Sequence, residues 1–123
     1  MANLKIQYAS DLHLEYTANQ NRLKERPLVP TGEVLVLAGD ICQFIQKDEH
    51  EEFWDYCSKN FRETYIVPGN HEYIRCDLGD YDGPFEIDLR KNVRYIDKKS
   101  VVIGDCEIFF TTFWTKISPE QQI

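Results

Sequence analysis

Four short stretches of the chain have the hydrophobic pattern of β-strands. Residues 4–10 alternate between apolar and polar side chains, and residues 34–38 form a continuous apolar run of strand length. Residues 64–67 and 93–96 are further short runs of this kind. A continuous run is typical of a strand buried on both faces, as in a parallel sheet, so we expect residues 34–38 to be covered on both sides.

An amphipathic helix is predicted between the second and third of these strands. Asp48 is a candidate N-cap, and Glu51 three residues later completes a capping box. The apolar face that follows at helical spacing consists of Phe53, Trp54, Cys57 and Phe61. A strand, a helix and a strand in succession predict two parallel neighbouring strands joined by a right-handed crossover.

The remaining segments are predicted to be loops and a hairpin. Residues 16–32 are polar and contain two prolines, which indicates a loop with a short helix around 19–25. Residues 76–84 are rich in aspartate and glycine and are expected to form a surface loop. Residues 101–103 and 106–111 flank a Gly-Asp pair, the pattern of a β-hairpin with a two-residue turn.

The composition is typical of a soluble globular protein. The chain has 123 residues, of which 42% are hydrophobic and 28% are charged. This length provides for a single domain, residues 1–123, with one modest core. No apolar run reaches the roughly 18 residues of a membrane-spanning helix, and the N-terminus lacks the pattern of a signal peptide. We therefore expect a cytoplasmic protein with no membrane partner.

Charge and cysteine content narrow the function classes. The net charge of −7 disfavours a protein that grips nucleic acid through a basic face. It does not exclude a phosphate substrate, because carboxylates can first capture divalent cations whose charge then dominates locally. The four cysteines form no C-x-x-C pair, which argues against a zinc knot and favours free, mostly buried thiols.

Three of the strand-like runs end in potential metal ligands. Asp11 and His13 follow the first run, Asp40 follows the second, and Asn70 and His71 follow the third. Ligands of parallel α/β sheets bind outside the carboxyl ends of the strands, so three neighbouring strands would bring these clusters to one edge. Each cluster alone has a plainer interpretation, as surface polar residues or as turn chemistry. Their conjunction predicts a metal site.

The residue types indicate the class of metal. Aspartate together with histidine suits Mn, Fe or Zn better than calcium. Asp40 can place one oxygen on each of two cations, and the Asn70 amide can offer a carbonyl oxygen without adding negative charge. Gly39 and Gly69 let the backbone turn sharply where a side chain would collide with metal or substrate.

The three clusters together resemble the first three motifs of the calcineurin-like metallophosphoesterases. These motifs are SDLH at 10–13, LAGDI at 37–41 and VPGNHE at 67–72, and TTFWT at 111–115 is also similar to a segment of bacterial and phage-type members. The motif set is specific to the superfamily but not to one substrate. The resemblance implies an α/β fold in which this chain is the N-terminal half of a sandwich, a mixed sheet with flanking helices that has four α/β/β/α layers when complete.

The resemblance also implies a metal-dependent phosphohydrolase of phosphate mono- or diesters with two divalent ions, Mn, Fe or Zn. Asp11, His13 and Asp40 would hold the first ion, and Asp40 and Asn70 the second. His71 and Asn70 would be the catalytic residues, with His71 stabilising charge on the phosphate or protonating the leaving oxygen. Asn70 and Glu72 could also orient neighbouring groups, and a structural role for Glu72 is an open alternative.

The sequence departs from the family pattern after residue 71. The family completes its site with histidines in a Gly-His and a Gly-His-x-His motif, whereas the histidines here are His13, His50 and His71. His50 lies in a charged stretch and is interpreted as a solvated helix residue. Residues 118–121 have the signals of a helix start, yet Ile123 is the last residue. We therefore expect a truncated phosphoesterase domain with an incomplete metal site.

A truncated sandwich would expose the sheet face that meets the second sheet. Such a face should be apolar, and large exposed apolar patches drive association, so we expect a homo-oligomer or a complementing chain. The substrate partner implied by the resemblance is a phosphate ester. An alternative function, favoured by the missing histidines, is a non-catalytic binding or scaffold domain that retains the phosphoesterase fold. A nuclease of the same superfamily is disfavoured by the acidic charge.

Overall fold

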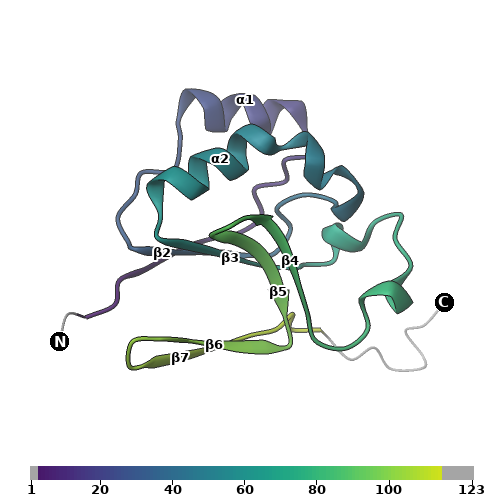
Figure 1. The fold of residues 1–123 in the computed structure, drawn as a ribbon. Coiled ribbons are helices and arrows are strands. Elements are labelled where there is room, and N and C mark those ends of the chain that lie inside the picture. Colours follow the sequence, from purple (N-terminus) through teal and green to yellow (C-terminus); the bar gives the residue numbers. More distant parts are fainter. Residues whose placement is uncertain (1–2, 115–123) are drawn as a thin grey trace.

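The computed structural model describes residues 3–114, which form three layers. Two helices, α1 (Thr17–Glu25) and α2 (Glu51–Asn60), cover one face of a five-stranded sheet, and a β-hairpin lies against the other face (Figure 1). The predicted α/β class with a mixed sheet is therefore confirmed. The helix start predicted at residues 118–121 lies outside the described residues, and the extent of the domain stays a prediction.

The sheet is mixed, with the strand order β1-β2-β3-β5-β4. Its strands are β1 (Ile6–Ala9), β2 (Val34–Ala38), β3 (Glu63–Val67), β4 (Phe85–Arg90) and β5 (Val93–Asp97). Strands β1, β2, β3 and β5 are mutually parallel neighbours, and β4 is antiparallel to β5. The predicted parallel pairing on either side of α2 is confirmed. Strand β4 was not predicted, although Phe85, Ile87 and Leu89 alternate with polar residues along it.

The parallel register places the carboxyl ends of β1, β2 and β3 side by side. Ala9 at the end of β1 pairs with Leu37, and Ala38 at the end of β2 pairs with Val67 at the end of β3. The chain therefore leaves all three strands at the same edge of the sheet. The three clusters of polar residues singled out in the sequence follow directly from these strand ends.

Helix α2 packs on the sheet with the apolar face that its sequence predicts. Trp54 and Cys57 are fully buried, and the indole nitrogen of Trp54 donates to the carbonyl of Lys47 at 2.7 Å. The start of the helix differs from the prediction, because α2 begins at Glu51 without a side-chain cap. The predicted Asp48 cap is wrong, since this residue belongs to a separate 3₁₀ helix (Phe44–Glu49) that leads into α2.

His50 joins the 3₁₀ helix to α2 and is buried, so its interpretation as a solvated residue is also wrong. Its ring lies edge-on to Trp54, with centroids 6.4 Å apart, and it lines a cavity of about 220 Å³ between α1 and α2. Burial lowers the pKa of His50, because the interior disfavours the charged ring. Tertiary packing against Trp54 therefore places the ring inside, although Glu51 and Glu52, which follow it, are exposed.

Helix α1 confirms the short helix predicted within the polar segment, although it begins at Thr17 rather than near Asn19. None of its residues is fully buried, which agrees with the polar sequence. Among residues 3–114, no helix is long and apolar enough to cross a membrane.

Each face of the sheet has its own apolar cluster. On the helix side, Leu35, Leu37 and Ile66 pack with Trp54 of α2. On the opposite side, Val34 and Tyr65 pack with residues that include Phe110 of the hairpin. Strand β2 contributes to both clusters, which is what its continuous apolar run predicted.

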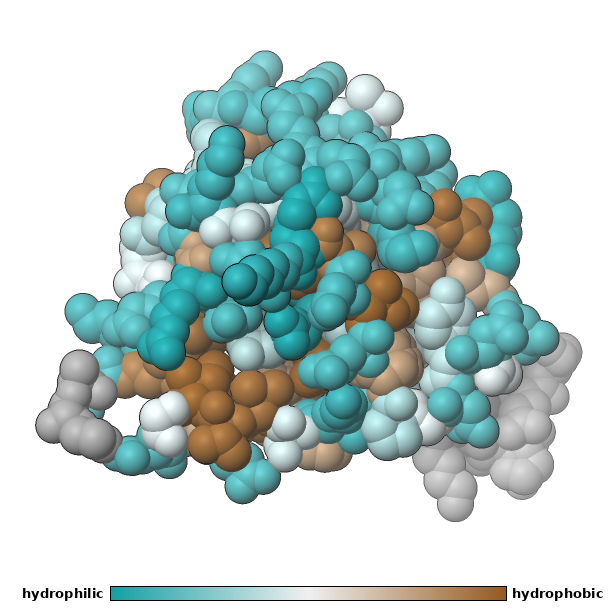
Figure 2. Space-filling view, viewed as in Figure 1, coloured by the Kyte–Doolittle hydropathy of each residue, from teal (hydrophilic) through white to brown (hydrophobic). Residues whose placement is uncertain are grey.

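The hairpin consists of β6 (Lys99–Ile103) and β7 (Cys106–Phe110), as the sequence predicted. Tyr8 of β1 remains 80% exposed, and the hairpin residues Val102 and Phe109 are 69% and 64% exposed. Figure 2 shows apolar side chains gathered in the lower part of the view, where the hairpin lies. The expected association through this face stays a prediction.

The four cysteines are free thiols, as the sequence predicted, but only two of them are buried. Cys42 and Cys57 are buried, Cys76 is half-buried and Cys106 is exposed. Burial raises the pKa of Cys42 and of Cys57 to about 12, which keeps both thiols protonated.

The central position of β2 leads to a prediction for stability. Leu37 is completely buried between neighbouring strands and below the helices, so Leu37→Ala should lower the free energy of unfolding by about 2–5 kcal/mol. Urea denaturation followed by tryptophan fluorescence measures this change. Val102→Ala, on the exposed side of the hairpin, should change stability by no more than about 0.5 kcal/mol. Equal effects of the two substitutions would contradict the packing described.

Candidate metal centre

Backbone hydrogen bonds join the loop after β1 to the end of β2. The amide of Asp11 donates to the carbonyl of Gly39 at 2.9 Å, and the amide of His13 donates to the carbonyl of Asp40 at 3.0 Å. The amide of Leu14 continues this ladder to Ile41 at 2.7 Å. The first two clusters predicted from the sequence are thus held side by side by main-chain contacts.

The end of β3 approaches the same point because Gly69 lacks a side chain. A Cβ atom at this position would lie only 2.3 Å from Oδ1 of Asp40. The amide of His71 donates to that same oxygen at 2.9 Å. Gly39 adopts a φ of +91°, a conformation open mainly to glycine. The sharp turns predicted at both glycines are thus explained by close packing against Asp40 and Gly69, whereas the predicted collision with metal or substrate stays a prediction.

Three of the proposed ligands have strained backbones. Asp11, His13 and Asp40 have φ values of 58°, 47° and 55°, in the left-handed region that residues with a Cβ rarely adopt. Such conformations cost on the order of 1–3 kcal/mol each and persist only where surrounding contacts enforce them. Their concentration at one sheet edge makes this edge a candidate functional site.

Glu72 is the buried centre of this edge. Its Oε1 accepts hydrogen bonds from the amides of Gly69 at 2.7 Å and Asp40 at 2.8 Å. Its Oε2 accepts from the amides of Ile41 at 2.8 Å and Cys42 at 3.2 Å, and from the hydroxyl of Tyr95 at 2.9 Å. Burial raises the pKa of Glu72, and the hydrogen bonds from Gly69, Ile41, Tyr95 and Cys42 oppose that shift. The sequence left open whether Glu72 has a structural role, and these hydrogen bonds support such a role.

The predicted ligands Asp11, His13 and Asp40 meet at this edge. One potential ligand atom from each lies within 4.8 Å of the others, and Nε2 of His13 is 3.6 Å from Oδ1 of Asp11. The Asp11 side chain is 63% exposed, whereas that of His13 is 22% exposed. Two carboxylates and an imidazole suit a divalent transition metal, so the donor set fits the class of ion predicted from the sequence.

The Asn70 amide lies directly against the carboxylate of Asp40. One end of the amide is 3.1 Å from Oδ1 and 3.2 Å from Oδ2 of Asp40. If this end is nitrogen, it donates to both oxygens. If it is oxygen, three acceptors converge, an arrangement that a shared cation would stabilise. Asn70 therefore lies beside Asp40, as the sequence predicted, and it is exposed. Its role as a metal ligand stays a prediction.

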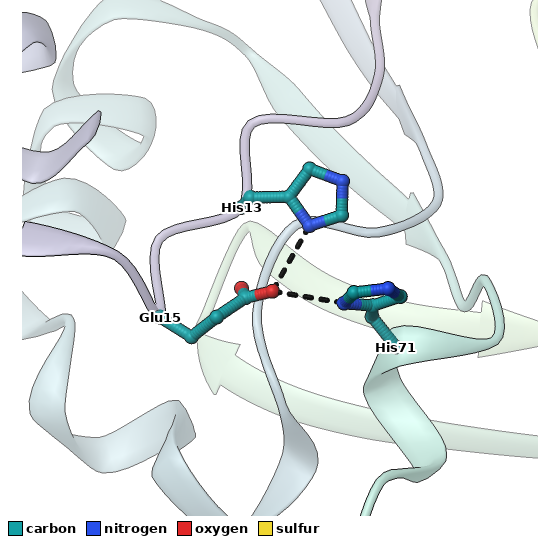
Figure 3. A group of neighbouring side chains, drawn as sticks. All are labelled: His13, Glu15 and His71. Carbon is teal, nitrogen blue, oxygen red and sulfur yellow. Dashed lines mark hydrogen bonds and ion pairs between the residues drawn. The ribbon is translucent and has the colours of Figure 1, made fainter. Parts of the chain in front are cut away.

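A second group of side chains adjoins the first, and one member was not predicted. Oε1 of Glu15 is 2.9 Å from Nδ1 of His13 and 3.0 Å from Nδ1 of His71 (Figure 3). The two rings stand edge to face, with centroids 4.6 Å apart. Glu15 follows His13 at the spacing by which His13 follows Asp11, and extending this D-x-H pattern by one step would have found it.

Electrostatics link Glu15 to His13. Burial favours the neutral form of the His13 ring, but the hydrogen bond and the charge of Glu15 outweigh burial and raise the pKa of His13. Burial alone would raise the pKa of Glu15, but its hydrogen bonds, that with His13 first, lower it. Each pKa is thus shifted in the direction that stabilises the charged form of its group.

Comparison with known protein families agrees with this geometry. The sequence profile of the family described as calcineurin-like phosphoesterase matches residues 4–116. The chain belongs to the calcineurin-like phosphoesterase family. Searches among curated proteins and among solved structures found no match.

Membership gives the chain a metallophosphoesterase fold in a family that typically uses divalent metals. The sheet edge that gathers Asp11, His13 and Asp40 is the location of the candidate metal ligands in this calcineurin-like phosphoesterase. His50, by contrast, lies in the cavity between α1 and α2.

The contacts of Glu72 predict a large effect of a small substitution. Glu72→Gln replaces an oxygen acceptor by an NH₂ group that would face backbone N–H donors, leaving buried groups unpaired. The free energy of unfolding should fall by about 3 kcal/mol or more. Chemical denaturation measures the loss, with Glu25→Gln on the exposed face of α1 as the matched control. A change as small as that of the control would show that the carboxylate does not hold the strand ends together.

Proposed function

We propose that this protein binds a divalent cation through Asp11, His13, Asp40 and Asn70 and hydrolyses a phosphate ester there. The observation that carries the proposal is the convergence of the ligand atoms of Asp11, His13 and Asp40 within 4.8 Å, at the ends of neighbouring parallel strands. When bound, a divalent cation supplies Lewis-acid polarisation of the phosphate and neutralises charge that develops on its oxygens.

The side chains around the site would leave a bound cation accessible to a small anion. Glu72 is completely buried below the ligands, whereas Asn70 and Asp11 are exposed at the opening. A phosphate group therefore has access from the side where Asp11 and Asn70 lie. The net charge of −7 makes a small phosphate mono- or diester a better substrate than an extended nucleic acid.

His71 is the residue that we propose to act on the substrate. Its backbone is fixed by the hydrogen bond from its amide to Asp40, and its side chain remains 29% exposed. A ring at this position can donate a hydrogen bond to a phosphate oxygen or a proton to the leaving oxygen. Asn70 contributes by holding Asp40 and by offering its own amide oxygen.

A non-catalytic binding domain is the second candidate function. Within residues 3–114, a second cation beside Asp40 and Asn70 would find only these two of the proposed ligands. A domain that holds one cation and a phosphate group without turnover agrees with this smaller ligand set.

Hydrolysis of p-nitrophenyl phosphate and bis-p-nitrophenyl phosphate with added Mn²⁺ tests the proposal. Asp40→Asn should lower the metal-dependent rate by more than about 100-fold, because loss of a ligand should exceed the 10–100-fold effect typical of residues that only support ligands. Asp48→Asn, at an exposed carboxylate outside the site, should leave the rate unchanged. Chelation by EDTA should abolish the activity of the wild-type protein.

Calorimetric titration with Mn²⁺ separates the two candidate functions. Binding by the wild-type protein but not by Asp40→Asn, together with turnover, supports the hydrolase. The same binding difference without any turnover would reject the enzyme in favour of the binding domain. Equal Mn²⁺ affinity of both proteins would reject the metal centre.

A further inference from the structure

The buried carboxylate of Glu15 is not explained by a contribution to protein stability. Its side chain is only 6% exposed, and Oε2 is buried without a hydrogen-bond partner among residues 3–114. A buried carboxylate with an unused oxygen is costly, and an apolar side chain of similar size would stabilise such a position at least as well. The carboxylate must therefore serve the groups that it does contact, which are the rings of His13 and His71.

A single oxygen of Glu15 contacts both rings through the same ring atom. Oε1 lies 2.9 Å from Nδ1 of His13 and 3.0 Å from Nδ1 of His71, as the dashed lines in Figure 3 mark. An ionised carboxylate can only accept hydrogen bonds, so each Nδ1 must carry the hydrogen. A neutral imidazole has one N–H group, and Nε2 of each ring then keeps its lone pair.

We propose that Glu15 is a positioning residue that fixes both histidines in the Nδ1–H tautomer. For His13, the free Nε2 is the atom on the side of Asp11, at 3.6 Å, which makes it the ligand atom of the proposed cation. For His71, Figure 3 shows the second ring nitrogen on the side turned away from Glu15. The carboxylate also sets the orientation of both rings, because hydrogen bonds to one oxygen hold them edge to face.

The same three side chains allow one competing arrangement. His13, Glu15 and His71 each offer a ligand atom, and these atoms lie within 4.8 Å of one another. A cation held there would bind Nδ1 of both rings and would displace the hydrogens that the proposal places on these atoms. The two arrangements thus differ in which ring nitrogen carries hydrogen.

Long-range ¹H–¹⁵N spectra of the imidazole rings distinguish these two arrangements without a measurement of enzymatic activity. The protein has only three histidines, so each ring is assigned readily, with His50 as an internal reference outside the site. In metal-free protein at alkaline pH, where the rings are neutral, we expect the Nδ1–H pattern for both His13 and His71. Added Zn²⁺ should shift Nε2 of His13 and leave hydrogen on its Nδ1.

Three variants show whether Glu15 causes this pattern. Glu15→Ala removes the acceptor and should produce mixed tautomers for both histidines, whereas Glu15→Gln keeps a carbonyl acceptor and should retain the Nδ1–H form. Glu25→Ala, at an exposed glutamate of α1, should change neither ring. The affinity for Zn²⁺ should fall about 10–100-fold in Glu15→Ala, the range for residues that orient a metal ligand.

The role assigned to His71 in this inference rests on the proposed hydrolase function, but the tautomers do not. An Nε2–H pattern for either histidine in the wild-type protein would overturn the inference, as would unchanged tautomers in Glu15→Ala. Loss of hydrogen from Nδ1 of both rings on addition of Zn²⁺ would assign a cation to Glu15 instead. The expected tautomers in a protein that hydrolyses no phosphate ester would support the inference and reject the hydrolase.

Discussion

The structure of the site depends on one buried carboxylate, that of Glu72. It accepts hydrogen bonds from main-chain amides at the ends of both β2 and β3 and thereby joins these two strand ends, together with the hydrogen bond from the amide of His71 to the carboxylate of Asp40. Hydrogen bonds from backbone N–H to a carboxylate are stronger than neutral ones. The position of Asp40 follows, since its own amide is one of the four donors.

The carboxylate of Glu72 is surrounded by a buried tyrosine and by residues with strained backbones. Below it lies Tyr95, which is completely buried and donates its hydroxyl hydrogen. Around it are three aspartate and histidine residues with positive φ values, whose backbones the ladder from Gly39 to Ile41 holds in place. Exposure then increases outward to Asp11 and Asn70. A buried, hydrogen-bonded interior thus supports candidate ligands that solvent can reach.

The sequence was sufficient to predict which strand ends meet at the site. It was not sufficient to predict the start of α2, the burial of His50 or the contacts of Glu15. The apolar runs of β2 and β3 reflect burial of these strands, whereas β1 was predicted from alternation and is partly exposed. Parallel pairing then brings the three strand ends together. The cap of α2 was mispredicted because Asp48 continues a 3₁₀ helix, and His50 turns inward by tertiary packing that overrides its charged neighbours. Local spacing could have found Glu15 beside His13, but not its contact with His71, which lies 56 positions away along the chain.

The central claim is that these strand ends form a cation-binding cleft. Anomalous diffraction at the manganese edge, from crystals grown with saturating Mn²⁺, tests it most directly. The account predicts a strong anomalous peak within ligand distance of Asp11, His13 and Asp40. The account would be contradicted if these three side chains lay in the positions described but no anomalous peak appeared beside them. A peak only elsewhere on the protein would also contradict it.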